Sequence, residues 1–221
     1  MRINHKPFPA PLAMIASVGG LASIASADIP QMGGPMSHLL VSIFNDQVFL
    51  EFESPSMSTV ELQSSPSSFG GSASVLDGMG FNSQFGWLAE GFISLPPSSG
   101  VFVRALSMSQ HLEVYSEFGY DPIMGTDGSD QTWQWDGTMT HNWFATEVKG
   151  PHAASFEVFV GDLSGNPLDG WTSGTIDLNF IYGGDPNDRL GVRGAGMVGQ
   201  VPSPGSLLVL GSGFCMVRRR R

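Results

Sequence analysis

Hydrophobic and polar residues alternate with a period of two along much of the chain between residues 28 and 200. This period is typical of half-buried β-strands, because successive side chains of a strand point to opposite faces. Val48 and Leu50, for example, fall on one face of their segment, whereas Glu51 falls on the other. The same alternation recurs over residues 39–43, 60–63, 101–104, 111–114, 156–160 and 176–180. The pattern therefore predicts about eight short strands.

The segments between these strands are rich in turn-forming residues. Asn45 and Asp46 separate two predicted strands and favour a tight hairpin. Residues 64–74, rich in Ser, Pro and Gly, predict a long loop. No part of the body shows a sustained helical period with caps. We therefore predict an all-β domain over residues 28–182, an antiparallel β-sandwich or flattened barrel, followed by a spacer over residues 183–200.

The composition supports one folded domain with an acidic surface. Hydrophobic residues make up 41% of the chain and include 15 phenylalanines, enough for a core. All 20 acidic residues but only four of the ten basic ones lie between residues 28 and 200. Such a surface repels phosphate backbones, so we predict no nucleic-acid partner. The only cysteine, Cys215, lies near the C-terminus, so no disulfide can cross-link the body.

The N-terminus has the order of segments found in secretory signal peptides. Two basic residues among the first six precede a mostly apolar stretch over residues 12–26. The small residues Ala25 and Ala27 then occupy the two positions that a signal peptidase inspects. We therefore predict a helical signal peptide over residues 1–27, cleaved between Ala27 and Asp28.

The C-terminus combines a proline motif, an apolar segment and a basic cluster. Pro202, Ser203 and Pro204 precede residues 206–217, which are uncharged and mostly apolar. The chain then ends in four arginines, Arg218, Arg219, Arg220 and Arg221. The apolar segment is shorter than the roughly 20 residues of a relaxed spanning helix. The arginines are typical of a stop signal that stays in the cytoplasm. We expect a short apolar helix that holds the chain at a membrane.

This tail, residues 201–221, resembles the PEP-CTERM sorting signal of Gram-negative bacteria, including planctomycete-like members. Ser203 stands where the family usually has a glutamate. The resemblance implies an exosortase-like transpeptidase as a partner, in addition to signal peptidase, and cutting near the proline motif. It also implies an exported protein that is tethered to the inner membrane during sorting and then reaches the cell surface or the extracellular space. Proteins of this kind are often associated with exopolysaccharide, which becomes a further candidate partner.

The histidines offer one candidate metal site. His38, His141 and His152 could supply zinc or copper ligands in a periplasmic metal-binding protein. The chain has no closely spaced histidine pair of the kind that catalytic metal sites usually contain. The alternative is that these histidines, with His111, are ordinary polar residues of strand faces and loops.

Aspartates and tryptophans offer two further candidates. Asp121, Asp127 and Asp130 lie in one loop region, and such oxygen ligands suit Ca²⁺, although their spacing does not match an EF-hand. Trp133 and Trp135 fall on one face of a predicted strand, where they could form a platform for sugar rings. Turn formation by the aspartates and burial of the tryptophans in the core are the alternatives.

The sequence contains none of the common catalytic motifs, such as a nucleophile elbow, a zinc-protease helix or a phosphate-binding loop. The prediction is therefore a non-enzymatic, secreted or surface-anchored protein that serves as a structural or adhesive part of the envelope or extracellular matrix. A carbohydrate- or calcium-binding module is the first alternative, and a secreted hydrolase is the second. No cofactor is predicted apart from Ca²⁺ in the first alternative.

Overall fold

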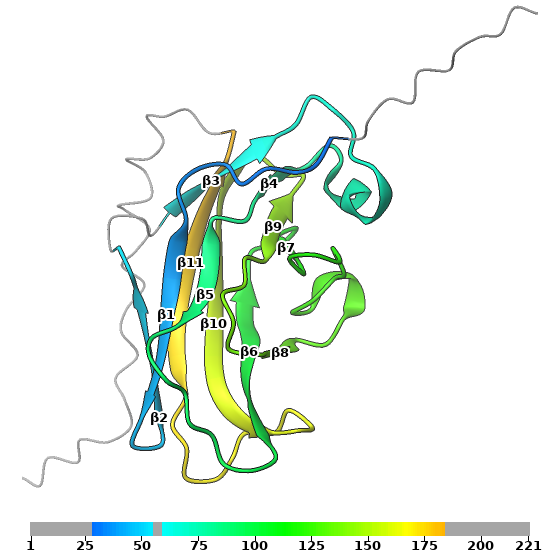
Figure 1. Ribbon diagram of the computed structural model, residues 1–221. Helices are drawn as coiled ribbons and strands as arrows, with labels where there is room; N and C mark the ends of the chain where they lie inside the picture. Colours follow the sequence, from blue (N-terminus) through cyan, green and yellow to red (C-terminus); the bar gives the residue numbers. More distant parts are fainter. Residues whose placement is uncertain (1–27, 55–58, 184–221) are drawn as a thin grey trace, which may run out of the picture.

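A computed structural model describes residues 28–54 and 59–183, which we call the two-sheet body (Figure 1). The predicted signal peptide, the sorting tail and their helices lie outside the described residues, as does the predicted spacer beyond Gly183. The body is mostly β-structure, as the alternation predicted. Neither of its two short helices is long and apolar enough to cross a membrane.

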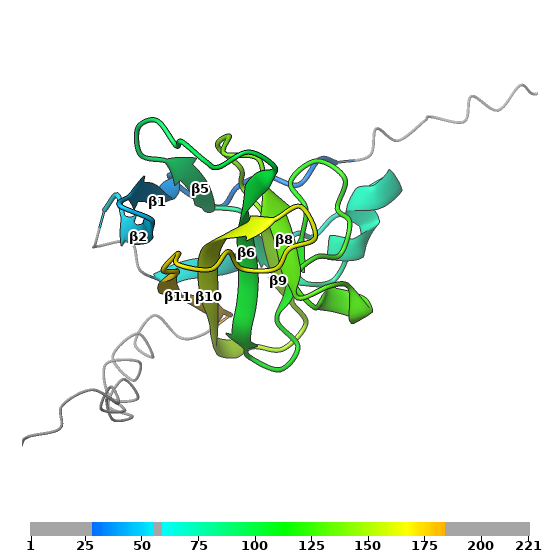
Figure 2. The same cartoon turned by 90° about the horizontal axis from the view of Figure 1, so that it is seen from below.

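Two sheets make up the body. The smaller has the order β2-β1-β5, with β1 at Ser37–Phe44, β2 at Gln47–Phe52 and β5 at Phe85–Ala89. The larger has the order β7-β9-β4-β3-β11-β10-β6-β8. Its strands are β3 (Thr59–Ser64), β4 (Gly80–Asn82), β6 (Ser99–Met108), β7 (Glu113–Tyr115), β8 (Thr132–Trp135), β9 (Trp143–Thr146), β10 (Gly150–Asp162) and β11 (Gly174–Tyr182). Figure 2 shows β1, β2 and β5 grouped on one side of β11, β10 and β6.

The pairing of the strands differs from the fully antiparallel arrangement that we expected. β1 pairs in parallel with β5, and β3 pairs in parallel with β11. Between β1 and β5 the chain passes through β2, crosses to the larger sheet as β3 and β4, and then returns. Alternation specifies which face of a strand is buried but not the direction of its neighbour, which depends on these crossovers.

The predicted hairpin between β1 and β2 is confirmed. Asn45 and Asp46 both adopt positive φ angles, of 50° and 58°, as a type I′ turn requires. Phe44 pairs with Gln47 across the turn, and the two strands run antiparallel from there.

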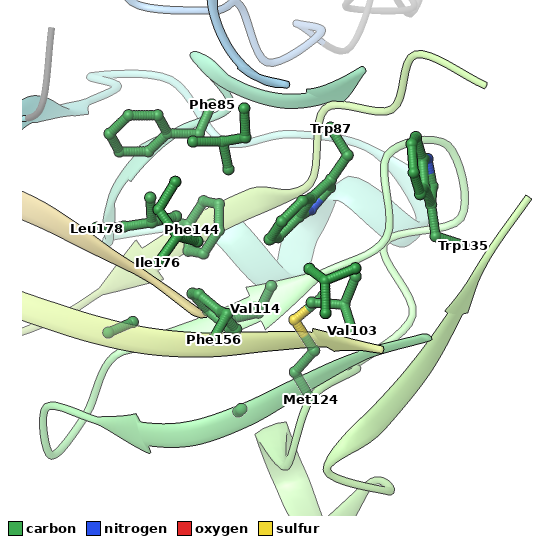
Figure 3. Packing of buried hydrophobic residues seen from close by; sticks show 14 of the residues in the cluster. Phe85, Trp87, Val103, Val114, Met124, Trp135, Phe144, Phe156, Ile176 and Leu178 are labelled. Atoms are coloured by element: carbon green, nitrogen blue, oxygen red, sulfur yellow. The ribbon is translucent and has the colours of Figure 1, made fainter. Parts of the chain in front are cut away.

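The main core lies between the two sheets (Figure 3). Phe85 and Trp87 of the smaller sheet face Phe156 of the larger one, and Phe144 lies between the Phe85 and Phe156 rings. The Trp87 and Phe156 rings meet edge to face with centroids 6.0 Å apart, a favoured aromatic geometry. The predicted inward faces are confirmed, since the following residues are buried: Leu39, Val41, Val48, Val60, Leu62, Val101, Val103, Val114, Val158, Ile176, Leu178 and Phe180.

A second, smaller core covers the opposite face of β4 and β9. The 3-10 helix η2 (Gly71–Leu76) buries Ala73 and Leu76 in a cluster that contains Phe81 and Trp143. The predicted loop over residues 64–74 was therefore wrong in part, because residues 71–74 belong to this helix and Ser64 ends β3.

The two ends of the body differ in the segments that they carry. At one end lie the β1–β2 turn, the β5–β6 loop (residues 90–98) and the β10–β11 loop (residues 163–173). Ser99 pairs with Asp162 there, and Thr172 bridges to β2. Tyr182 pairs with Gly150 at the opposite end, so β11 leaves the sheet away from these loops (Figure 1). We call the three-loop end the loop end.

Candidate functional site

The loop end exposes three large apolar side chains, one at the end of β1 and one in each of the two longer loops. Phe44 is 68% exposed beside the β1–β2 turn, Phe92 is 92% exposed in the β5–β6 loop, and Leu163 is 66% exposed in the β10–β11 loop. Scattered apolar residues are normal on a protein surface. Phe44, Phe92 and Leu163 are notable because all three lie at one end of the body, where a single partner could cover them.

The loops themselves are held in defined conformations. Backbone hydrogen bonds join Val48 to Thr172 and Thr172 to Asp46, both at 2.9 Å, so the β1–β2 turn and the β10–β11 loop are connected. In the β10–β11 loop, the Asp162 carboxylate accepts hydrogen bonds from the backbone N–H groups of Ser164 and Asn166. The Asn166 backbone N–H in particular lowers the pKa of Asp162. The apolar tips therefore project from a structured base.

A shallow groove of about 380 Å³ lies beside Phe92, between the β5–β6 loop and the end of β8. Ile93 and Leu95 contribute apolar lining, and Gln134 and Asp136 contribute polar groups. The Thr138 hydroxyl donates to the Asp136 carboxylate at 2.6 Å and lowers the pKa of that carboxyl group. An exposed aromatic ring beside amide and carboxylate groups is a combination that suits sugar hydroxyls and ring faces.

The predicted tryptophan platform is wrong. Trp133 and Trp135 do share a face of β8, but Trp133 is partly buried against the main core and Trp135 is only 2% exposed. The Trp135 indole Nε1 donates to the Thr138 carbonyl at 2.7 Å. Both rings serve packing, because that face of β8 continues the inward face of β6, to which β8 is paired.

The three aspartates of the predicted calcium site do not come together. No group of three His, Cys, Asp or Glu side chains within residues 28–54 and 59–183 could hold a metal ion. Asp127 adopts a positive φ of 52° in the 3-10 helix η3 (Thr126–Gly128), and the Asp130 carbonyl accepts a hydrogen bond from Gly125. Asp121 is exposed, and its backbone N–H donates a hydrogen bond to the Ser116 hydroxyl oxygen. The turn-forming alternative accounts for these residues.

The structure brings together two of the three predicted histidine ligands. The His38 and His141 rings lie with their centroids 5.6 Å apart. His152 pairs instead with Phe180 across β10 and β11, and its Nε2 bonds to the Val148 carbonyl. A three-histidine site was therefore a wrong prediction. The spacing of the histidines in the sequence could not reveal the pair, because the segment after β8 places His141 beside His38 only in the folded chain.

Asp28, the predicted first residue after signal cleavage, is exposed and forms a parallel bridge with Phe69. The other predicted processing residues lie outside the described residues. Comparison of the chain with models of protein families, with curated proteins and with solved structures found no match. Function is therefore inferred from the chain's own residues, of which the loop end and the histidine pair are the two distinctive arrangements.

Proposed function

We propose that the protein is an exported, non-enzymatic adhesive or structural component of the cell envelope or extracellular matrix, which contacts its partner through the loop end. The observation that carries this proposal is the position of the loop end relative to Tyr182. β11 ends at Tyr182, at the end of the body opposite the loop end, and the predicted spacer and tail follow in the sequence. A body tethered by this tail presents Phe44, Phe92 and Leu163 away from the membrane.

The exposed side chains provide the affinity in this proposal. Burying one large apolar side chain contributes roughly 1.5–3 kcal/mol, so three loop tips covered together make a useful contact. Part of that gain is offset by the cost of association and of ordering side chains. The contact is therefore weak for a single molecule and becomes strong when many copies act together on a surface.

The finer architecture belongs to the same proposal. A helical signal peptide over residues 1–27 precedes a β-sandwich or flattened barrel, and the spacer over residues 183–200 leads to the tail at residues 201–221. An exosortase-like transpeptidase cuts near Pro202 to Pro204. The product is then anchored at the cell surface or released.

Attachment assays test the role of the loop end. A variant carrying Phe44→Ser, Phe92→Ser and Leu163→Ser should keep its melting temperature and lose at least half of its attachment to cells or matrix of the source organism. Phe118→Ser is the matched control, because Phe118 is 86% exposed but lies in the segment after β7. Unchanged attachment in the triple variant, or an equal loss in the control, would refute this role.

Processing of the tail is tested separately. Deleting residues 206–221 should release the protein from the membrane fraction, and mass spectrometry of the mature form should find a new C-terminus near residues 202–204. An exported mature protein that still ends in Arg221 would show membrane retention without sorting.

A carbohydrate-binding module is the second candidate, favoured by the groove beside Phe92. The exposed amide of Gln134 and the ring of Phe92 flank this groove. Binding on a glycan array that is lost in both Phe92→Ala and Gln134→Ala would favour this function. Attachment that depends on Phe44 and Leu163 but not on Gln134 would favour the broader adhesive contact.

A further inference from the structure

The histidine pair lies on the outer face of the smaller sheet, away from the loop-end contact. His38 is on β1, and His141 follows β8 and precedes β9. His141 is only 5% exposed, although imidazole is a polar group. The ring planes meet at 66°, with centroids 5.6 Å apart. A buried imidazole next to a second, partly buried one requires a physical explanation.

Each ring uses its Nδ1 atom in a hydrogen bond to an oxygen that can only accept. His38 Nδ1 lies 2.6 Å from Glu53 Oε2, and His141 Nδ1 lies 2.8 Å from the Ser83 carbonyl oxygen. These bonds require a hydrogen on both Nδ1 atoms, so a neutral ring carries a free lone pair on Nε2. Both Nε2 atoms are buried and have no hydrogen-bond partner among the described residues. Metal-ligating histidines show this same pattern, in which a carboxylate or carbonyl holds the far nitrogen.

Gly86 makes room for the pair. A Cβ atom at this position would lie 2.5 Å from both Cε1 and Nε2 of His141. Gly86 is also the register partner of His38 on the neighbouring strand. The Nε2 edge of His141 therefore lies directly over the residue next to His38, and both histidines occupy the same face of the sheet.

From these observations we propose that His38 and His141 bind a copper(I) ion through their Nε2 atoms. No third His, Cys, Asp or Glu side chain of residues 28–54 and 59–183 completes a ligand set. Zinc sites usually take three or four protein ligands, whereas copper(I) is stable with two or three ligands in all. Imidazole is a suitable ligand for copper. This inference does not depend on the adhesive function proposed above.

The ring separation allows one shared ion when both Nε2 atoms point toward it. Taking a metal–nitrogen distance of about 2.0 Å and about 1.2 Å from Nε2 to the ring centre, centroids 5.6 Å apart correspond to an angle of roughly 120° at the ion. This angle suits a trigonal site whose third ligand is a water or another small molecule, since two-coordinate copper(I) is close to linear. The carboxylates of Glu53 and Glu117 add negative charge behind the ligands, since Glu117 accepts a hydrogen bond from the His141 backbone N–H.

Anaerobic titration of copper(I) into the full-length chain, against a coloured competing chelator, tests the proposal. The chain carries Cys215→Ser, because a thiolate would bind copper(I) by itself. One copper per chain is expected, and X-ray absorption should show nitrogen neighbours at about 2 Å. His38→Gln and His141→Gln should each weaken binding at least 100-fold, and Zn²⁺ should bind less tightly than copper(I).

Two further variants keep the test decisive. Glu53→Gln replaces an exposed carboxylate, so the variant should fold normally. It should lower the affinity for copper(I) about 10–100-fold, because the carboxylate that holds His38 Nδ1 is lost. His152→Gln is the matched control, because His152 is also buried and also has an unpartnered nitrogen. It should leave copper binding unchanged.

Several results would overturn the proposal. They are a folded chain that takes up no stoichiometric copper, sulfur neighbours in the absorption spectrum, or tighter binding of Zn²⁺ than of copper(I). If His152→Gln lost as much copper(I) affinity as His38→Gln or His141→Gln, the effect would not be specific to the pair. If copper does not bind, a buried water between the two Nε2 atoms becomes the better explanation of the unpartnered nitrogens.

Discussion

Replacing Gly86 with alanine tests the placement of His141 directly. The new Cβ would lie 2.5 Å from two ring atoms of His141, and Cβ atoms essentially never approach a heavy atom within 3.0 Å. The His141 ring cannot move aside freely, because Nδ1 is bonded to the Ser83 carbonyl and its backbone N–H to Glu117. Overpacking of this kind costs roughly 1–3 kcal/mol. Alanine in a strand gains about 0.5–1 kcal/mol over glycine, so we expect a net loss of about 0.5–2 kcal/mol.

A double-mutant cycle separates this clash from other effects. In a His141→Ala background the ring is absent, so Gly86→Ala should be neutral or stabilising by about 0.5–1 kcal/mol. The expected coupling between the two positions is therefore about 1–3 kcal/mol. The free energy of unfolding is measured by urea denaturation, followed by tryptophan fluorescence. A coupling below about 0.5 kcal/mol would show that the His141 ring does not lie over Gly86.

Three other predictions follow from the packing. Trp135→Ala should lower the free energy of unfolding by about 3–5 kcal/mol, as for a buried aromatic residue. Trp133→Ala should lower it by clearly less, because Trp133 is only partly buried. Equal losses of unfolding free energy in urea denaturation would contradict this. Arg104→Ala should lower the free energy of unfolding more than Glu157→Gln in the same assay. The Arg104 guanidinium donates a hydrogen bond to Glu157 and also lies over the Phe159 ring, 4.9 Å from its centroid, so the alanine variant loses both contacts. Burial and a neighbouring carboxylate raise the pKa of Tyr115 well above its ordinary value. Its contribution to stability is therefore fully present below about pH 10 and lost as the pH rises further. Absorbance at the phenolate band should show Tyr115 still protonated at a pH at which the tyrosines of the unfolded protein have titrated, and titration of Tyr115 at the same pH in both states would refute this.

The local strand pattern was predictable because burial of one strand face leaves a period of two in the sequence. Leu39, Val41 and Phe156 were assigned to inward faces, and all are buried. The turn at Asn45 and Asp46 was predictable for a similar reason, since few residue pairs tolerate two positive φ angles in succession. These features depend on neighbours within a few residues.

The candidate sites were less predictable, because they depend on contacts between distant segments. Alternation placed Trp133 and Trp135 on one face, but it could not show that this face joins the core through pairing of β8 with β6. Only the folded chain brings His38 and His141 together. His152 does not join them, because it lies on β10, where it pairs with Phe180 of β11.

The sequence by itself determined the strand-forming segments, their inward faces and the tight hairpin, since each depends on short-range periodicity or composition. Only the tertiary structure decided the parallel pairing of β1 with β5, the gathering of three exposed loop tips at one end and the meeting of His38 with His141. Crossovers between the sheets bring these groups together. Such long-range contacts follow from packing of the whole core, which no local pattern encodes.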